Sequence, residues 1–204
     1  YNGEIYNFKE IRNELQALGH KFLSESDTEV VLNAIIQWGD DAINRFNGMF
    51  AFALWDKKRR VLTLARDRYG IKPLYLSKQG SIFSFASEHK AIAKHPDFKS
   101  SLNKAALLEY FTFQNIFTNQ TLIDDIEILP AGHYMKVDLG KPGHIKTELV
   151  QYWDYHFREP KQVLRPEEYI EELDRLFNQA VKRQLVGYVE LGAYLSGGMD
   201  SGSI

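Results

Sequence analysis

Residues 49–55, Met49-Phe50-Ala51-Phe52-Ala53-Leu54-Trp55, form the longest uninterrupted apolar run in the sequence. A second run follows at residues 61–65, after the charged residues 56–60, and two such runs around a short polar connection predict a β-hairpin. Apolar residues at consecutive positions predict strands that are covered on both faces, so helices or a second sheet must lie above and below them. The run therefore predicts a layered α+β domain.

Two amphipathic helices are predicted before this hairpin. The first has apolar residues at three- and four-residue steps and a glycine stop, given by Phe8, Ile11, Leu15, Leu18 and Gly19. The second opens on a capping box formed by Ser26 and Glu29 and ends at Gly39. A short helical turn is predicted over residues 41–46.

Residues 1–157 are predicted to form a first domain. Its later elements are a strand pair around Gly80, a helix over residues 103–113 and a strand over residues 134–137. The polar residues 158–165 predict a linker. A helix over residues 166–185, an apolar strand over residues 188–195 and a glycine-rich turn then predict the beginning of a parallel α/β domain at residues 166–204.

Composition narrows the functional class. The 204 residues include 25 Lys and Arg and 27 Asp and Glu, a net charge of −2 that argues against a broad nucleic-acid surface. The longest apolar run falls far short of the roughly 20 residues that cross a bilayer, so no membrane span is expected. With 0 cysteines, the sequence excludes a disulfide framework and thiolate metal sites, which favours a cytoplasmic protein.

Two short features near the start carry candidate chemistry. The carboxamide of Asn2 and the backbone N–H of Gly3 can aim two donors at one developing oxyanion, although Asn-Gly is also a common hairpin-turn dipeptide. Asp27 lies in the capping-box setting, which explains an acid there without any ligand. A fixed carboxylate at that position could also bind the ammonium group of an amino-acid substrate. The residues alone leave both alternatives open.

The loop Ser196-Gly197-Gly198-Met199-Asp200-Ser201 follows the last predicted strand, where backbone N–H groups can bind phosphate. The two glycines allow close approach, the two serines offer hydroxyl donors, and Asp200 can hold Mg²⁺. It is not a Walker loop, because Gly198-Met199 stands where Lys-Ser or Lys-Thr is required. A ligand-free turn is the alternative interpretation.

Six motifs, in order along the chain, together resemble those of glutamine-hydrolysing asparagine synthetases. They are Tyr1-Asn2-Gly3-Glu4-Ile5-Tyr6-Asn7, Ser26-Asp27-Thr28-Glu29, Phe46-Asn47-Gly48-Met49-Phe50-Ala51-Phe52-Ala53-Leu54, Arg66-Asp67-Arg68-Tyr69-Gly70-Ile71-Lys72-Pro73-Leu74-Tyr75, Phe85-Ala86-Ser87-Glu88 and Ser196-Gly197-Gly198-Met199-Asp200-Ser201. The resemblance implies an αββα N-terminal-nucleophile glutaminase followed by an α/β ATP-pyrophosphatase-type domain. It also implies that ammonia from glutamine passes to an acyl-adenylate of aspartate, made with ATP and Mg²⁺, to give asparagine, AMP and pyrophosphate.

The resemblance assigns roles to single residues. It places the oxyanion donors at Asn2 and Gly3, the glutamine pocket at Glu4 and the site for the glutamine ammonium at Asp27. For the nucleotide it implies a pocket at Leu195, contacts to ATP or pyrophosphate at Ser196, Gly197, Gly198 and Ser201, and a Mg²⁺ ligand at Asp200. The resemblance is compatible with a homodimer.

One departure from the family pattern matters. The family's nucleophile is a cysteine at the mature N-terminus, and this sequence has 0 cysteines. We expect that the chain begins inside the glutaminase domain, which is therefore incomplete, and stops early in the synthetase domain. Two other functions stay open: a related amidotransferase or amide-bond-forming synthetase that acts on a different carboxylate, and a catalytically silent scaffold.

Overall fold

The computed structural model describes residues 1–140, 144–160, 163–185 and 192–204. The chain divides into two compact units, Tyr1–Tyr155 and His156–Ile204. The domain and linker boundaries given above stay predictions.

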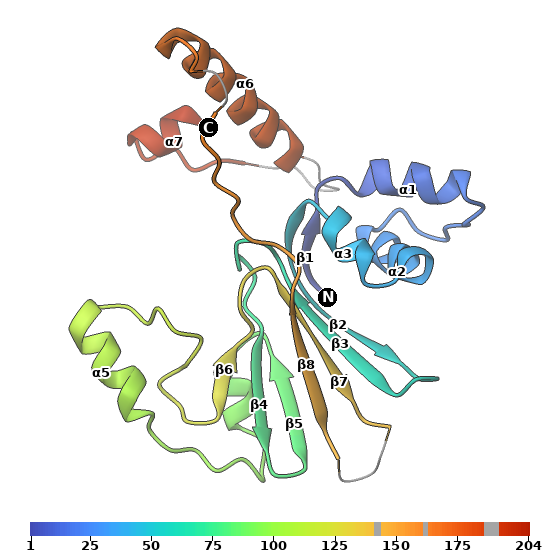
Figure 1. The fold of residues 1–204 in the computed structure, drawn as a ribbon, viewed down its shortest axis with the longest axis vertical. Helices are drawn as coiled ribbons and strands as arrows, with labels where there is room; N and C mark the ends of the chain where they lie inside the picture. Colours follow the sequence, from blue (N-terminus) through green and yellow to red (C-terminus); the bar gives the residue numbers. More distant parts are fainter. Residues whose placement is uncertain (141–143, 161–162, 186–191) are drawn as a thin grey trace. The chain divides into compact units, whose positions relative to one another are not determined.

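The first unit is built on an antiparallel five-stranded sheet in the order β1-β2-β3-β7-β8 (Figure 1). Its strands are β1 (Asn2–Ile5), β2 (Gly48–Asp56), β3 (Val61–Arg66), β7 (His133–Asp138) and β8 (Lys146–Gln151). The hairpin predicted from the apolar run is β2 and β3, with Phe52 opposite Ala65. The structure confirms this hairpin.

A second, three-stranded sheet has the order β5-β4-β6. Its strands are β4 (Tyr75–Gln79), β5 (Ile82–Ala86) and β6 (Ile126–Ile128). Apolar residues from both sheets form one core between them, composed of Ala51, Leu64, Leu74, Leu76, Leu129 and Val137. The two sheets therefore pack face to face, as in a sandwich.

Three helices cover the other face of the larger sheet (Figure 1). They are α1 (Phe8–Ala17), α2 (Asp27–Trp38) and α3 (Asp41–Arg45), and their buried side chains are apolar. Because neighbouring side chains of a strand point to opposite faces, Phe50 meets this helix layer while Ala51 faces the second sheet. The Phe50 ring packs edge-on against Phe46, with centroids 5.8 Å apart.

The outer side of the smaller sheet is covered by α4 (His89–Ala93), which packs against β4 and β5, while α5 (Lys104–Phe113) lies beyond that sheet (Figure 1). The layers therefore run helix, sheet, sheet, helix. The predicted mixed fold with an αββα arrangement is confirmed for the first unit.

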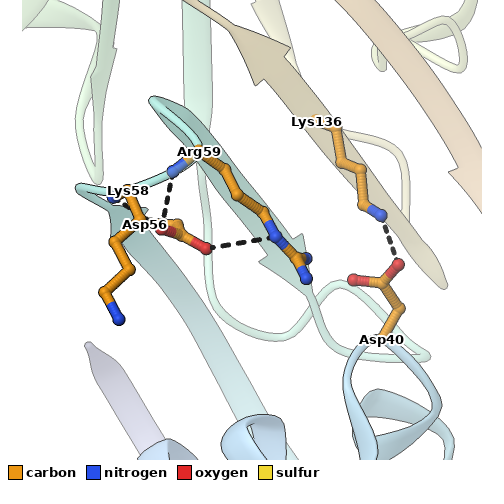
Figure 2. A network of polar contacts seen from close by, with 5 residues as sticks. All are labelled: Asp40, Asp56, Lys58, Arg59 and Lys136. Atoms are coloured by element: carbon orange, nitrogen blue, oxygen red, sulfur yellow. Dashed lines mark hydrogen bonds and ion pairs between the residues drawn. The ribbon is translucent and has the colours of Figure 1, made fainter.

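Charged side chains close the hairpin and tie the helix layer to the sheet (Figure 2). Asp56 accepts the backbone N–H groups of Lys58 and Arg59 at 2.9 and 3.0 Å, so the charged connection is a turn. Asp40, just before α3, pairs with Lys136 on β7.

Several local predictions need correction. Leu18 was expected on the buried stripe of the first helix, but it follows the last turn of α1 and is 53% exposed. Ser26 caps α2 as predicted, yet Glu29 does not complete a capping box, because its carboxylate accepts the N–H groups of Leu23 and Ser24 instead. The far end of β2 is open on one side, since Trp55 is 42% exposed.

The second unit contains α6 (Pro166–Gln184) and the short α7 (Met199–Ser203). Pro166 is the first residue of α6, as predicted. Most of the strand predicted over residues 188–195 lies outside the described residues, and residues 192–195 are not in a strand. Within the described ranges, no helix combines the length and the apolar character that crossing a bilayer requires.

Candidate active site

The candidate oxyanion residues lie on β1, at the edge of the larger sheet. Asn2 and Glu4 are exposed, and Gly3 is half-buried. The alternative of a β-turn at Asn2-Gly3 is wrong, because Asn2, Gly3 and Glu4 pair with Ala51, Phe50 and Met49 of β2.

Gly3 is required by the close approach of β1 and β2. Its φ is +144°, and a Cβ built there would lie 2.0 Å from the carbonyl oxygen of Met49. Gly48, on the facing strand, has the same constraint, since its Cβ would lie 2.1 Å from the carbonyl oxygen of Glu4. Backbone packing thus explains the glycine at position 3, whatever its N–H does in catalysis.

Asp27 is connected to this strand by two hydrogen bonds. Its Oδ2 accepts the hydroxyl of Tyr1 at 2.5 Å and the backbone N–H of Ile5 at 3.1 Å. The cap of α2 is made by Ser26, whose Oγ accepts the N–H of Thr28 at 3.1 Å, so capping does not explain the Asp27 carboxylate. Because Asp27 contacts the residues on either side of Asn2, Gly3 and Glu4, the structure brings all four predicted residues together.

Glu29 holds the loop that leads into this corner. Its carboxylate accepts the hydroxyl of Ser24 at 2.6 Å and the N–H groups of Leu23 and Ser24 at 2.8 and 2.7 Å. These bonds, first of all that from the Ser24 hydroxyl, lower the pKa of Glu29 below its ordinary value. The loop before Asp27 is therefore fastened by an ionised carboxylate.

Asp67 supports β2, the strand that pairs with β1, and no role was predicted for it from the sequence. It is fully buried, and its carboxylate accepts four backbone N–H groups, those of Phe50, Tyr69, Ile71 and Lys72, at 3.0–3.1 Å. Arg66 beside it donates to three carbonyl oxygens, those of Lys72, Leu129 and Gly70. An Asp followed by Gly three residues later was the available signal, since carboxylates often accept backbone N–H groups in turns.

The predicted nucleotide loop lies in the second unit. Ser196 and Ser201 are joined through their hydroxyl oxygens at 2.9 Å, and the N–H of Ser196 donates to the Ser201 hydroxyl at 3.2 Å. Gly197 has a φ of +79°, which favours glycine. Gly198 precedes α7, Asp200 lies in its first turn, and Leu195 is 74% exposed. The structure thus brings the two serines together around Gly197 and Gly198.

Metal binding depends on which carboxylate and imidazole side chains lie close together. Across the described part of the chain, no group of three His, Asp or Glu side chains is arranged to hold a metal ion. Mg²⁺ is commonly held by one or two carboxylates together with substrate phosphates, so the single carboxylate of Asp200 fits a Mg²⁺ that arrives with a nucleotide.

Two cavities open between α2 and β2, and the smaller one is lined by sequence neighbours of the predicted residues, Tyr1, Ser26 and Thr28. The cavities measure about 420 and 690 Å³ and share Leu32, Ile35 and Leu54. Neither is lined by Asn2, Gly3, Glu4 or Asp27. The candidate site is therefore defined by the hydrogen bonds between Asp27 and the residues of the edge strand and its flank, Tyr1 and Ile5.

Comparisons with known proteins give two family matches. The glutamine amidotransferase domain matches residues 1–153, and asparagine synthase matches residues 172–204. An asparagine synthetase [glutamine-hydrolyzing] 3 of Bacillus subtilis is 39% identical over 210 residues, which cover 100% of this chain and 32% of that protein. A putative asparagine synthetase [glutamine-hydrolyzing] 2 of Methanocaldococcus jannaschii is 34% identical and is covered to 38%. The chain thus spans about a third of the length of these relatives.

Among solved structures, one described as the allosteric regulatory enzyme of purine biosynthesis aligns with a TM-score of 0.49 at 19% identity, over 72% of this chain and 27% of that chain. The family of this chain is shown by the match to the glutamine amidotransferase domain, which covers residues 1–153 and includes every strand of both sheets. The chain belongs to the glutamine amidotransferase domain family.

Proposed function

We propose that the protein carrying this chain is a glutamine-dependent asparagine synthetase. The observation that carries the proposal is the order of the two family matches, an amidotransferase domain followed by the beginning of an asparagine synthase domain in one chain. The names of the curated relatives, which align over the whole chain, support the same activity.

In the amidotransferase domain, the proposal assigns glutamine hydrolysis to the corner formed by β1 and Asp27. The Asn2 carboxamide and the Gly3 N–H would stabilise the oxyanion, Glu4 would line the glutamine pocket, and Asp27 would bind the α-ammonium. The hydrogen bonds that Asp27 accepts from Tyr1 and Ile5 support this grouping. The thiol nucleophile is expected from a part of the protein outside this chain.

In the synthase domain, the proposal assigns the nucleotide to the loop at residues 195–201. Leu195 would contact the nucleotide, Ser196, Gly197, Gly198 and Ser201 would bind phosphate oxygens, and Asp200 would hold Mg²⁺. ATP would activate the side-chain carboxylate of aspartate, and ammonia from glutamine would then displace AMP. The serine contacts and the positive φ of Gly197 support a compact phosphate-binding turn.

The experiment supplies the full-length protein with glutamine, ATP, Mg²⁺ and either aspartate or a panel of other carboxylates. We expect pyrophosphate and an amide product, asparagine, only when aspartate is the carboxylate supplied. Amidation of another carboxylate would replace the proposal with a related synthetase, and a protein inert toward glutamine and ATP would be the scaffold. A cytoplasmic location and a homodimer stay predictions.

A further inference from the structure

The two oxygens of the Asp27 carboxylate have different surroundings. Oδ2 accepts two donors, the Tyr1 hydroxyl at 2.5 Å and the Ile5 N–H at 3.1 Å. Oδ1 receives only the hydroxyl of Thr28, at 3.4 Å, among the contacts of the described residues. Because each carboxylate oxygen offers two lone-pair sites, Oδ2 is saturated and Oδ1 still has capacity to accept.

We propose that Tyr1 is a positioning residue, which turns the Asp27 carboxylate so that Oδ1 receives the α-ammonium of glutamine. The inference rests on the proposed function and deepens it, because it names the group that sets selectivity for an α-amino substrate. Ile5 alone cannot do this, since a single donor on Oδ2 leaves the carboxylate free to swing about its broad terminal torsion.

The chemistry of Tyr1 suits this role. Its side chain starts beside the edge strand and crosses to the first turn of α2, so it links the elements that carry Asn2 and Asp27. Burial of the hydroxyl, and next the bond to Asp27, raise the pKa of Tyr1 well above its ordinary value. Tyr1 therefore remains a hydrogen-bond donor throughout the pH range in which an enzyme works.

The test compares two substrates in the full-length protein: glutamine, and glutaramate, which has the same carboxamide but lacks the α-ammonium. We expect Tyr1→Phe to lower kcat/KM for glutamine by about tenfold, the size of one hydrogen bond to a charged group, mainly through KM. The value for glutaramate should change by less than about twofold, because that substrate does not use Asp27. Tyr6→Phe, which removes a hydroxyl from the same segment, is the matched control and should leave both values unchanged.

A double-mutant cycle separates positioning from a general structural effect. In an Asp27→Asn background, Tyr1→Phe should have no further effect on glutamine, because the two residues act as a unit. Three results would overturn this inference and leave the proposed function standing: an equal loss of kcat/KM for both substrates, no loss for either substrate, or additive losses in the double-mutant cycle. A wild-type protein that hydrolyses neither compound would overturn the proposed function and, with it, this inference. Melting curves of each variant identify any that fail to fold. If Tyr1→Phe does not fold, Thr28→Ala takes its place in the double-mutant cycle with Asp27→Asn, because Thr28 donates to Oδ1, the oxygen proposed to receive the ammonium. The effect of Thr28→Ala should also be confined to glutamine.

Discussion

The backbone N–H of Phe50 donates to Oδ2 of Asp67 at 3.1 Å, so a buried carboxylate holds β2 at the position that faces Gly3. The same carboxylate accepts the N–H groups of Tyr69, Ile71 and Lys72. Asp67 therefore joins its own loop to Phe50, 17 residues earlier, on the strand that pairs with the edge strand carrying Asn2.

Asp67→Asn should lower the free energy of unfolding by about 2–4 kcal/mol, because the amide replaces an acceptor by a donor at a fully buried position and leaves backbone N–H groups around it unpaired. Urea denaturation followed by tryptophan fluorescence measures the change. Asp56→Asn is the control, since Asp56 accepts two backbone N–H groups at an exposed turn and should have a much smaller effect. Equal effects of the two substitutions would contradict the role of burial.

Gly3→Ala should destabilise the chain by more than the ~1 kcal/mol expected for alanine at a glycine of positive φ, because the new Cβ meets the β2 backbone. Gly80→Ala is the matched control, as Gly80 also has a positive φ, +59°, but open space around its Cβ position. Thermal melting of both variants separates the clash from the backbone preference. A melting temperature for Gly3→Ala at or above that of Gly80→Ala would show that the strands do not approach closely.

Glu29 should make stability depend on pH in the acid range. Its pKa in the folded protein lies below the ordinary value of 4.5. Its contribution to the free energy of unfolding is therefore fully present above pH 4.5 and is lost as the pH falls through the pKa of the folded protein. The melting temperature of Glu29→Gln should therefore lie below that of the wild type at neutral pH, and the difference should shrink as the pH is lowered below 4.5. A difference that stays constant across this range would mean that the carboxylate does not hold the loop.

The sequence predicted the elements whose apolar pattern is long. The β2–β3 hairpin, α1 and α2 are within a few residues of their predicted bounds, because each has a run or a stripe of apolar residues. β1 was missed because four residues containing Asn-Gly look like a turn, and its pairing with β2 depends on residues more than forty positions away. α4 and β6 have only 5 and 3 residues, too few for a periodic pattern.

Candidate site residues could be predicted only where a motif marked them. Asn2, Gly3, Glu4 and Asp27 came from motifs, and the structure then placed Asp27 against β1. The functions of Tyr1 and Asp67 depend on hydrogen bonds between residues that are distant in sequence, and such contacts leave no local pattern. Their positions therefore required the fold.

Asn2→Ala in the full-length protein should slow glutamine hydrolysis by about 10²–10³-fold, the usual loss for one oxyanion donor. Synthesis from free ammonia should continue, because the synthase reaction does not use Asn2.

The reciprocal variant is Asp200→Asn, which should abolish pyrophosphate release and leave glutamine hydrolysis unchanged, since it removes a hard oxygen ligand for Mg²⁺. Full glutamine turnover in Asn2→Ala, or normal pyrophosphate output in Asp200→Asn, would disprove the corresponding assignment.

We propose that one protein releases nitrogen from glutamine and uses it to amidate aspartate. The decisive experiment supplies the full-length protein with glutamine labelled with ¹⁵N in its amide, together with aspartate, ATP and Mg²⁺, and measures the products by mass spectrometry. We expect asparagine that carries ¹⁵N in its amide, with one pyrophosphate formed for each asparagine. Labelled ammonia that accumulates without labelled asparagine or pyrophosphate would contradict it.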